Sequence, residues 1–254
     1  MARADVKLEI LWQSSDAVAV AKPPGLAVIP GRGETTSLLE QLANQLQLPW
    51  TGTVDPRLRV VHRLDKETSG VLLMATHIDM QRHLSHQFQN NTIEKEYLAL
   101  ISGRPSADEG EIESPLAPHP TQKKKMAIVK HGGRPARTIL KVEETFRDYT
   151  LLRVFPKTGK THQIRVHLQS IGLPLAIDPL YNPARGGEPG IFLSSFKRGY
   201  RAAEREERPL IDRLTLHAHR LTFLNRDGNR ITVEAPIPKD LRATFNMLRK
   251  YSRA

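Results

Sequence analysis

Short strand-like segments dominate the chain, and they do not alternate regularly with helices. Runs rich in β-branched and aliphatic residues lie at 7–12, 17–21, 58–61, 71–75, 93–102, 138–142, 150–155, 214–224 and 231–235. Helical spacing of apolar residues is confined to 37–46, 76–88, 162–171 and 238–250. Because parallel sheets need a helix after nearly every strand, this order predicts an α+β fold with a largely antiparallel sheet.

Turn and capping residues set the expected boundaries. Ser37 with Glu40 forms a capping box, and Thr76 with Asp79 is expected to cap the second helix. Asp227-Gly228 predicts a hairpin turn. Residues 103–133 fit either a pair of edge strands or a long exposed excursion, and 182–213 are expected to form a mobile, charged loop with few apolar anchors.

The composition excludes several classes of protein. The chain has 254 residues, 39% of them hydrophobic, and no cysteine, so disulfide scaffolds, thiolate metal sites and cysteine nucleophiles are ruled out. The start of the sequence is polar and has no apolar h-region of the kind that signal peptides contain, and no apolar run reaches the roughly 20 residues of a membrane span. We therefore expect a cytoplasmic protein that does not bind membranes.

The charge is strongly positive. Lysine and arginine outnumber aspartate and glutamate by 38 to 27, which gives a net charge of +11. Such an excess attracts nucleic acid, phosphates or anionic lipid, although surface charge also serves solubility.

Common cofactor motifs fail when they are tested residue by residue. A phosphate-binding loop ending at Gly159-Lys160-Thr161 would need glycine where Val154 stands, and the glycines at 31 and 33 lack the third glycine of a dinucleotide fingerprint. The histidine pairs lack the i, i+4 spacing with a neighbouring glutamate that zinc hydrolases use. We expect no cofactor and no metal.

One polar turn interrupts the apolar strands at residues 61–70. Asp65 in this turn can be read as an ordinary turn residue that bonds its own backbone. It can also be read as a nucleophile, because the neighbouring His62, Arg63 and Lys66 would favour an ionised carboxylate. The residues of this segment alone leave both readings open.

Five motifs together resemble the pseudouridine synthases of the RluA family. They are Lys22-Pro23-Pro24-Gly25, the segment His62–Gly70, Glu94-Lys95-Glu96-Tyr97, the segment Thr161–His167, and Leu216-His217-Ala218. They occur in the family's order and span about residues 8 to 240. A chance match to all five is far harder than a match to one.

The resemblance implies a fold and an activity. The fold would be a single pseudouridine synthase-type catalytic domain over residues 1–254, with a mixed, mainly antiparallel sheet in two halves flanked by helices around a central cleft. We expect no separate N-terminal RNA-binding domain, although many members of this family carry one, and we expect a monomer. The activity would be the isomerisation of specific uridines in ribosomal or transfer RNA, without metal or organic cofactor.

The resemblance also implies roles for individual residues. Asp65 matches the catalytic aspartate that acts on the ribose of a flipped-out uridine, either by attacking C1′ or by removing a sugar proton. Arg165 matches the arginine that pairs with this carboxylate. Tyr97 matches the tyrosine that stacks on the target base and helps to remove the C5 proton.

Further residues match the family's substrate contacts. Arg63 matches the arginine that fills the space left by the flipped base, and His62 lies beside it in sequence. Leu216 matches an apolar residue of the pocket floor, although by sequence alone it is an ordinary core leucine.

Within residues 160–213 the chain departs from the family pattern at three further places. Lys160 replaces the usual arginine before Thr161-His162-Gln163, residues 176–181 keep Asp178 and Tyr181 but lack the usual glycine, and the loop at 182–213 is long. This loop could clamp RNA or simply be solvated. Two rival functions remain, a non-catalytic RNA-binding or ribosome-assembly factor on the same fold and a metal-dependent hydrolase that uses the scattered histidines.

Overall fold

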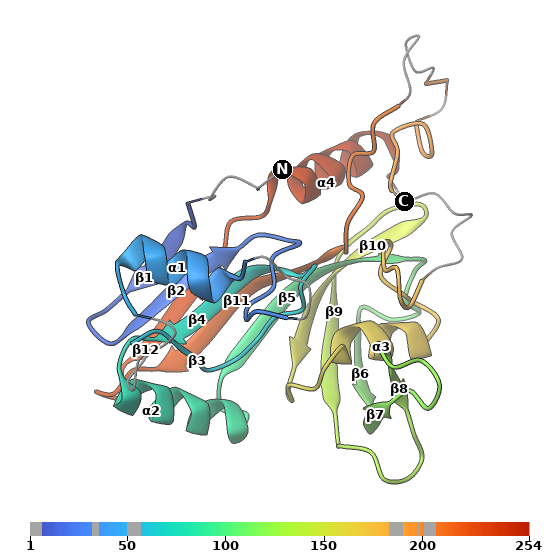
Figure 1. Cartoon of the computed structure of the whole chain (residues 1–254). Helices are drawn as coiled ribbons and strands as arrows, with labels where there is room; N and C mark the ends of the chain where they lie inside the picture. The colour runs from blue at the N-terminus through green and yellow to red at the C-terminus, as the bar shows by residue number, and fades with distance from the viewer. Residues whose placement is uncertain are drawn as a thin grey trace. The chain divides into compact units, whose positions relative to one another are not determined.

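A computed structural model describes residues 7–31, 36–49, 57–182, 190–197, 199–200 and 207–253. The chain divides into two compact units. Unit 1 contains Met1–Lys95 and Ala218–Pro236, and unit 2 contains Glu96–His217 and Ile237–Ala254. Each unit has its own strands and helices (Figure 1). No helix among the described residues is long and apolar enough to cross a bilayer.

The sheet of unit 1 has β4 (Ser69–Ala75) as a central strand. It is flanked by β2 (Ala17–Lys22) and the part of β11 (Leu216–Leu224) that lies in this unit, with β1 (Ile10–Gln13) and β12 (Arg230–Glu234) outside them. The two-residue β3 (Arg59–Val60) also pairs with β4. Strand pairing is antiparallel between β1 and β2, β2 and β4, β3 and β4, and β11 and β12. All residues of β4 are buried, so both faces of the sheet are covered there.

The helices of unit 1 follow the predicted apolar spacing. In α1 (Leu38–Leu46) the side chain of Ser37 accepts from the backbone N–H of Glu40, which confirms the predicted N-cap. The N-cap of α2 (Ile78–Gln89) is His77 instead of the predicted Thr76, because its imidazole accepts from Asp79 N–H. Met80 and Leu84 of α2 pack among buried residues of β2, β4 and β11, as their spacing predicts.

The sheet of unit 2 runs in the order β5 (Glu94–Ser102), β10 (Tyr149–Pro156), β9 (Arg137–Thr145) and β6 (Glu109–Glu113), and its registered pairs are antiparallel. A separate hairpin joins β7 (Leu116–Pro118) to β8 (Met126–Ile128). The segment 103–133 therefore supplies short strands, as the first of its two readings predicted.

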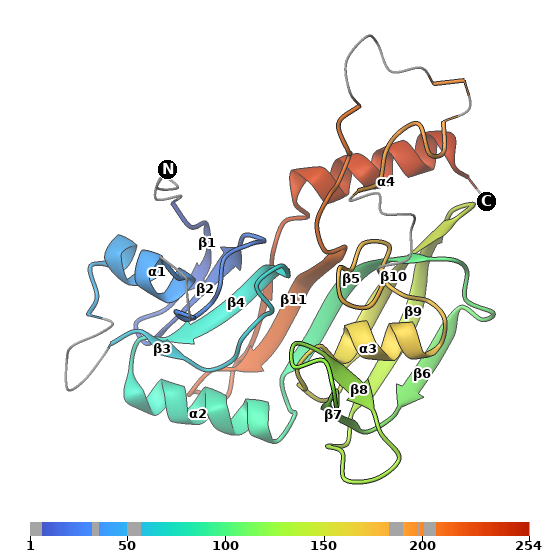
Figure 2. The same ribbon diagram turned by 45° about the vertical axis from the view of Figure 1, so that its right-hand side comes forward.

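Two helices cover opposite faces of the sheet of unit 2. The side chains of Ala99 and Ile101 lie in one cluster with Ile164 and Leu168 of α3 (Gln163–Ser170). Those of Leu98 and Leu100, which alternate with them, pack with apolar residues of α4 (Lys239–Tyr251). Figure 2 shows α3 beside the β7–β8 hairpin. The helical spacing at 162–171 predicts that Ile171 lies on the apolar side of α3, but α3 ends at Ser170 and Ile171 is 44% exposed.

The described parts of segment 182–213 contain apolar anchors that the sequence reading did not anticipate. Ile191 and Ile211 form a backbone bridge, and both side chains are buried with Phe196 against the α4 face of the sheet. The expectation of few apolar anchors is therefore wrong there. Residues 183–189, 198 and 201–206 lie outside the described residues.

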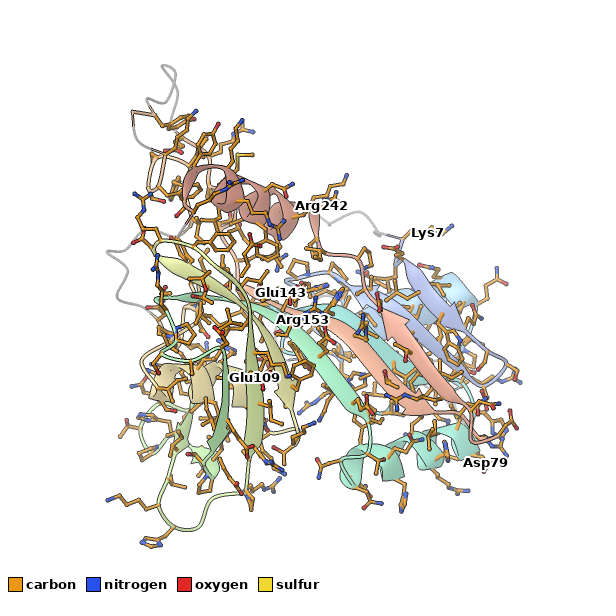
Figure 3. The ribbon with its side chains drawn as sticks, turned by 180° about the vertical axis from the view of Figure 1, so that it is seen from behind. Lys7, Asp79, Glu109, Glu143, Arg153 and Arg242 are labelled. Atoms are coloured by element: carbon orange, nitrogen blue, oxygen red, sulfur yellow. The ribbon has the colours of Figure 1, made fainter. Side chains whose placement is uncertain are left out.

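Oppositely charged side chains pair across neighbouring strands of unit 2. Arg153 on β10 binds Glu143 on β9 at 2.5 Å and also binds Glu96 on β5. Lys141 on β9 binds Glu109 on β6 at 2.7 Å. Figure 3 shows Arg153 close to Glu143. Much of the positive charge of this sheet is therefore already matched by carboxylates.

Candidate active site

The turn that carries Asp65 lies in unit 1, between β3 and β4. Asp65 is partly buried, and its carbonyl oxygen accepts a hydrogen bond from Thr68 N–H at 3.1 Å. Arg63, two residues earlier, is exposed. The strand before this turn ends at Val60, so Asp65 lies within an irregular loop.

A buried lysine fixes this turn to the preceding Pro-Gly loop. Lys22 is only 2% exposed, and its ammonium donates to the carbonyl oxygens of Pro23 at 2.9 Å, Leu26 at 2.7 Å and Lys66 at 2.7 Å. Gly25 N–H donates to the same Lys66 carbonyl at 2.9 Å. Each ammonium proton thus has a carbonyl partner, which offsets the cost of burying the charge. The backbone immediately after Asp65 is held from two sides.

The glycine at the end of the turn permits close packing of two strands. Gly70 has φ +124°, a backbone conformation that residues other than glycine rarely adopt. A Cβ atom at this position would lie 2.1 Å from the carbonyl oxygen of Ala218 on β11. Only glycine therefore allows β4 to begin so close to β11.

His62 is engaged with the interior of unit 1. Its Nε2 accepts from Leu73 N–H at 2.9 Å, and its ring stacks on Phe88 with the centroids 4.5 Å apart. Burial, together with the positive charge of Lys95, lowers the pKa of His62 to about 3. The ring is therefore neutral near pH 7, with its proton on Nδ1.

Unit 2 holds the other predicted residues on the α3 side of its sheet. Tyr97 on β5 packs against a cluster that contains Leu216 and Ile164. Arg165 follows Ile164 on α3 and is buried. The structure thus gathers Tyr97, Leu216 and the helix of Arg165 on one face.

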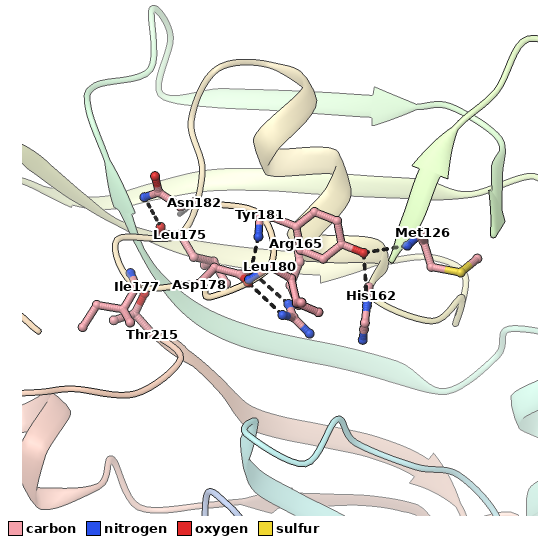
Figure 4. Close-up of polar contacts among 10 residues, drawn as sticks. All are labelled: Met126, His162, Arg165, Leu175, Ile177, Asp178, Leu180, Tyr181, Asn182 and Thr215. Carbon is pink, nitrogen blue, oxygen red and sulfur yellow. Dashed lines mark hydrogen bonds and ion pairs between the residues drawn. The ribbon is translucent and has the colours of Figure 1, made fainter. Parts of the chain in front are cut away.

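Arg165 makes a two-pronged ion pair with Asp178. Its Nε donates to Oδ2 at 2.8 Å and its Nη2 donates to Oδ1 at 2.7 Å (Figure 4). The side chains are 7% and 1% exposed. The ring of Tyr181 lies against the guanidinium, 5.1 Å from centroid to Cζ. An edge and a face of the guanidinium are therefore both in contact with residues of the loop that follows α3.

Tyr181 also fixes the start of α3. Its hydroxyl oxygen accepts from Met126 N–H at 2.8 Å and lies 2.9 Å from Nδ1 of His162. His162 itself has φ 53°, a left-handed conformation that is uncommon for residues other than glycine.

The polar residues of α3 fasten the helix to β9. The amide of Gln163 donates to Thr138 Oγ1 at 3.0 Å, and its oxygen accepts from Lys160 N–H at 3.0 Å. His167 contacts the same Thr138 hydroxyl at 2.9 Å and the Ser114 carbonyl at 3.2 Å, and burial lowers its pKa. The polar character of this segment thus has a structural explanation that its sequence did not reveal.

Comparison with known proteins gives these residues a family context. Residues 16–170 match the family model described as RNA pseudouridylate synthase. The chain belongs to the RNA pseudouridylate synthase family. The match includes Asp65, Tyr97 and Arg165. The resemblance inferred from the five motifs is therefore confirmed at the level of the family.

Similar proteins include ribosomal large subunit pseudouridine synthase D of Nitrosomonas europaea, 38% identical over 96% of this chain and 66% of the relative. The protein of that name from Escherichia coli strain K12 is 34% identical over 96% of this chain and 72% of the relative. The chain spans about two thirds of the length of such relatives, and 61% of the one from Neisseria meningitidis serogroup B strain MC58.

Solved structures support the fold. Human RNA pseudouridylate synthase domain containing 4 is 26% identical with a TM-score of 0.68, covering 95% of this chain and 93% of the other. Human RNA pseudouridylate synthase domain containing 1 is 24% identical with a TM-score of 0.70, covering 94% and 86%. The predicted α+β, pseudouridine synthase-type fold is confirmed.

The predicted site residues fall into two groups. His62, Arg63 and Asp65 share one loop of unit 1, while Tyr97, Arg165 and Leu216 lie in unit 2. Their catalytic and substrate-binding roles, including the pairing of Asp65 with Arg165, stay predictions. Across the described residues, no group of three or more His, Cys, Asp or Glu side chains is placed to hold a metal ion.

Sequence reasoning missed the roles of Lys22 and Asp178. Both belong to segments that were noted for the resemblance, but their bonds reach the backbone of Lys66, 44 residues away, and the side chain of Arg165 on α3. Their burial was the missing information, because a charged residue next to proline or glycine reads as part of a solvated loop.

Proposed function

We propose that this chain is an RNA pseudouridine synthase that isomerises uridine to pseudouridine in structured RNA. The observation that carries this proposal is the family match over residues 16–170, which includes the Asp65 turn, Tyr97 and Arg165. The names of the relatives favour RNA of the large ribosomal subunit as the substrate. Transfer RNA is the alternative substrate.

The reaction needs no co-reactant. The bond from C1′ to N1 breaks, the uracil turns, and a new bond joins C5 to C1′. The proton lost from C5 balances the one gained at N1. The developing positive charge on the sugar calls for a carboxylate, and the uracil anion is a tolerable leaving group without a second acid.

The proposed catalytic and binding residues have different tasks. Asp65 acts on the ribose, by attack on C1′ or by removal of a sugar proton, and Arg165 is its charge partner. Tyr97 stacks on the uracil and assists removal of the C5 proton. Arg63, which is exposed, stacks where the flipped base was, with His62 beside it, and Leu216 contacts the base from the apolar side.

Replacement of Asp65 by asparagine tests the proposal. The variant Asp65→Asn keeps nearly the same shape but loses the charge and nucleophilicity of the carboxylate. We expect pseudouridine formation in ribosomal RNA to fall at least ~10³-fold while RNA affinity stays within about twofold. Chemical mapping of pseudouridine after incubation with ribosomal and transfer RNA gives the rate and the substrate.

A matched control removes an equivalent charge from the surface. Asp108 is exposed, and Asp108→Asn should retain the wild-type rate. If wild-type protein modified neither RNA while binding both, a non-catalytic RNA-binding function would replace our proposal. If Asp65→Asn modified RNA at the wild-type rate, the assignment of Asp65 would be wrong.

A further inference from the structure

The carboxylate of Asp178 occupies two of the three nitrogens of Arg165. The contacts from Nε and Nη2, at 2.8 and 2.7 Å, are parallel and close the edge of the guanidinium. Each uses one hydrogen. Any further acceptor of Arg165 must therefore be reached through Nη1 or the second hydrogen of Nη2.

Asp178 is itself held in place by the backbone around it. Its Oδ1 accepts from the N–H groups of Leu180 at 2.9 Å and Tyr181 at 3.1 Å. Its own carbonyl accepts from Asn182 N–H at 2.9 Å, and the side chain of Asn182 donates to the Leu175 carbonyl at 2.8 Å. The carboxylate cannot follow a rotation of Arg165 without breaking these bonds.

Tyr181 restrains the guanidinium from a second direction. Its ring lies 5.1 Å from Arg165 Cζ, and its hydroxyl is anchored by Met126 and His162. Arg165 thus meets a fixed carboxylate at its edge and an anchored ring at its face. Figure 4 shows both contacts coming from the loop after α3.

We infer that Asp178 is a positioning residue that orients Arg165 for the isomerisation reaction. This inference rests on the proposed function. A long arginine side chain has several rotamers, and only one of them directs its remaining N–H groups towards a given acceptor. The bidentate bond to a fixed carboxylate selects that rotamer before RNA binds and offsets the entropy of ordering it.

Two variants of Asp178 separate positioning from a general need for the ion pair. Asp178→Asn offers one acceptor oxygen in place of two and turns an amide donor towards a cation, so we expect kcat to fall about 10- to 100-fold. Asp178→Glu restores the charge on a longer stem and should lose less. We expect KM for RNA to change less than twofold in both.

The matched control is another bidentate pair in unit 2. Asp240 accepts from Arg213 Nε at 2.6 Å and Nη2 at 2.8 Å. Asp240→Asn breaks this pair near the start of α4, and it should lower the melting temperature without lowering kcat. If Asp240→Asn reduced kcat as much as Asp178→Asn, the effect would be one of stability and the inference would fall.

A double-mutant cycle with Arg165→Lys tests whether Asp178 acts on kcat through Arg165. If Asp178 only stabilised the fold, the effect of Asp178→Asn on kcat would not depend on the residue at position 165. Lysine cannot form the two-pronged bond, so Asp178→Asn should cost less than threefold in kcat in the Arg165→Lys background. Additive losses would overturn the inference. If Asp178→Asn does not fold, the kcat of Asp178→Glu tests the inference instead. A wild-type kcat in Asp178→Glu would overturn the positioning role of Asp178. Failure of the proposed function is distinct, since wild-type protein would then form no pseudouridine.

Discussion

A histidine beside a proposed catalytic aspartate invites a role in proton transfer, but His62 is placed for a different task. Its Nε2 already accepts from the backbone of β4, and its ring stacks on Phe88 of α2. With a pKa near 3 it carries no charge at neutral pH. The imidazole therefore joins the turn of Asp65 to the core of unit 1.

The half-buried His62, with its lowered pKa, should make stability depend on pH. Its pKa is about 3 in the folded protein and 6.5 when unperturbed. As the pH falls below 6.5, the unfolded chain takes up a proton that the folded chain does not. Stability is therefore lost towards acid, by about 2 kcal/mol between pH 7 and pH 5 from this residue. His62→Gln, whose amide oxygen can still accept from Leu73, should remove that part of the slope.

Urea denaturation from pH 5 to pH 7 measures this dependence. The exposed His131 offers a control, and His131→Gln should retain the wild-type slope. Parallel curves for wild type and His62→Gln would contradict the assignment of the slope to His62.

At the scale of elements, the start of β4 depends on a glycine. Gly70→Ala would place a methyl group 2.1 Å from the Ala218 carbonyl in a backbone conformation that alanine disfavours. We expect a loss of about 3 kcal/mol or more in the free energy of unfolding. Gly228 has φ +80° with nothing within 4 Å of an added Cβ, so Gly228→Ala should cost only about 1 kcal/mol. Equal losses in urea titrations would show that the close contact does not matter.

Local sequence patterns predicted most elements because their causes are local. Apolar spacing placed helices α1 to α4, Ser37 caps α1, and Asp227-Gly228 forms the turn of the β11–β12 hairpin. The errors arose where a distant partner decides. The hydroxyl of Thr76 donates to the carbonyl of Ser15, 61 residues away, and His77 caps α2 instead. The anchors Ile191, Phe196 and Ile211 are buried by residues from β5, β10 and α4.

The sequence motifs predicted the residues of the candidate site, whereas buried contacts seen only in the structure explain how those residues are held. The five motifs supplied Asp65, Tyr97 and Arg165, but they did not show what holds these residues. The bonds of Lys22 to Lys66 and of Asp178 to Arg165 depend on long-range packing. No local rule of propensity or spacing encodes such contacts.

At the scale of the whole molecule, the net charge of +11 is unevenly available to RNA. Lysine and arginine side chains gather in three stretches of the sequence, 123–137, 197–208 and 242–253. In the first, Arg137 is already paired with Glu111, whereas Lys123 and Lys124 are exposed between β7 and β8. In the third, Arg249 is paired with Glu144.

The exposed lysines should therefore dominate the salt dependence. Replacing Lys123 and Lys124 by glutamine should reduce the slope of log affinity against log salt by about 1.5. The control with the same change of net charge replaces Arg137 and Lys141, which are paired with Glu111 and Glu109, and it should change the slope little. RNA binding measured by fluorescence anisotropy across a salt series gives both slopes. An equal change in both would mean that only net charge matters.

The order of strands in unit 1 bears on how the protein is made. β11 lies next to β4 in its sheet, yet 140 residues, 76–215, separate the two strands along the chain, and most of unit 2 lies within them. During synthesis the first strands leave the ribosome long before their neighbour does. The edge of β4 that pairs with β11 stays open until residues 216–234 have been synthesised. A chain that terminates before these residues therefore cannot complete the sheet of unit 1, although most strands of that sheet come from the start of the sequence.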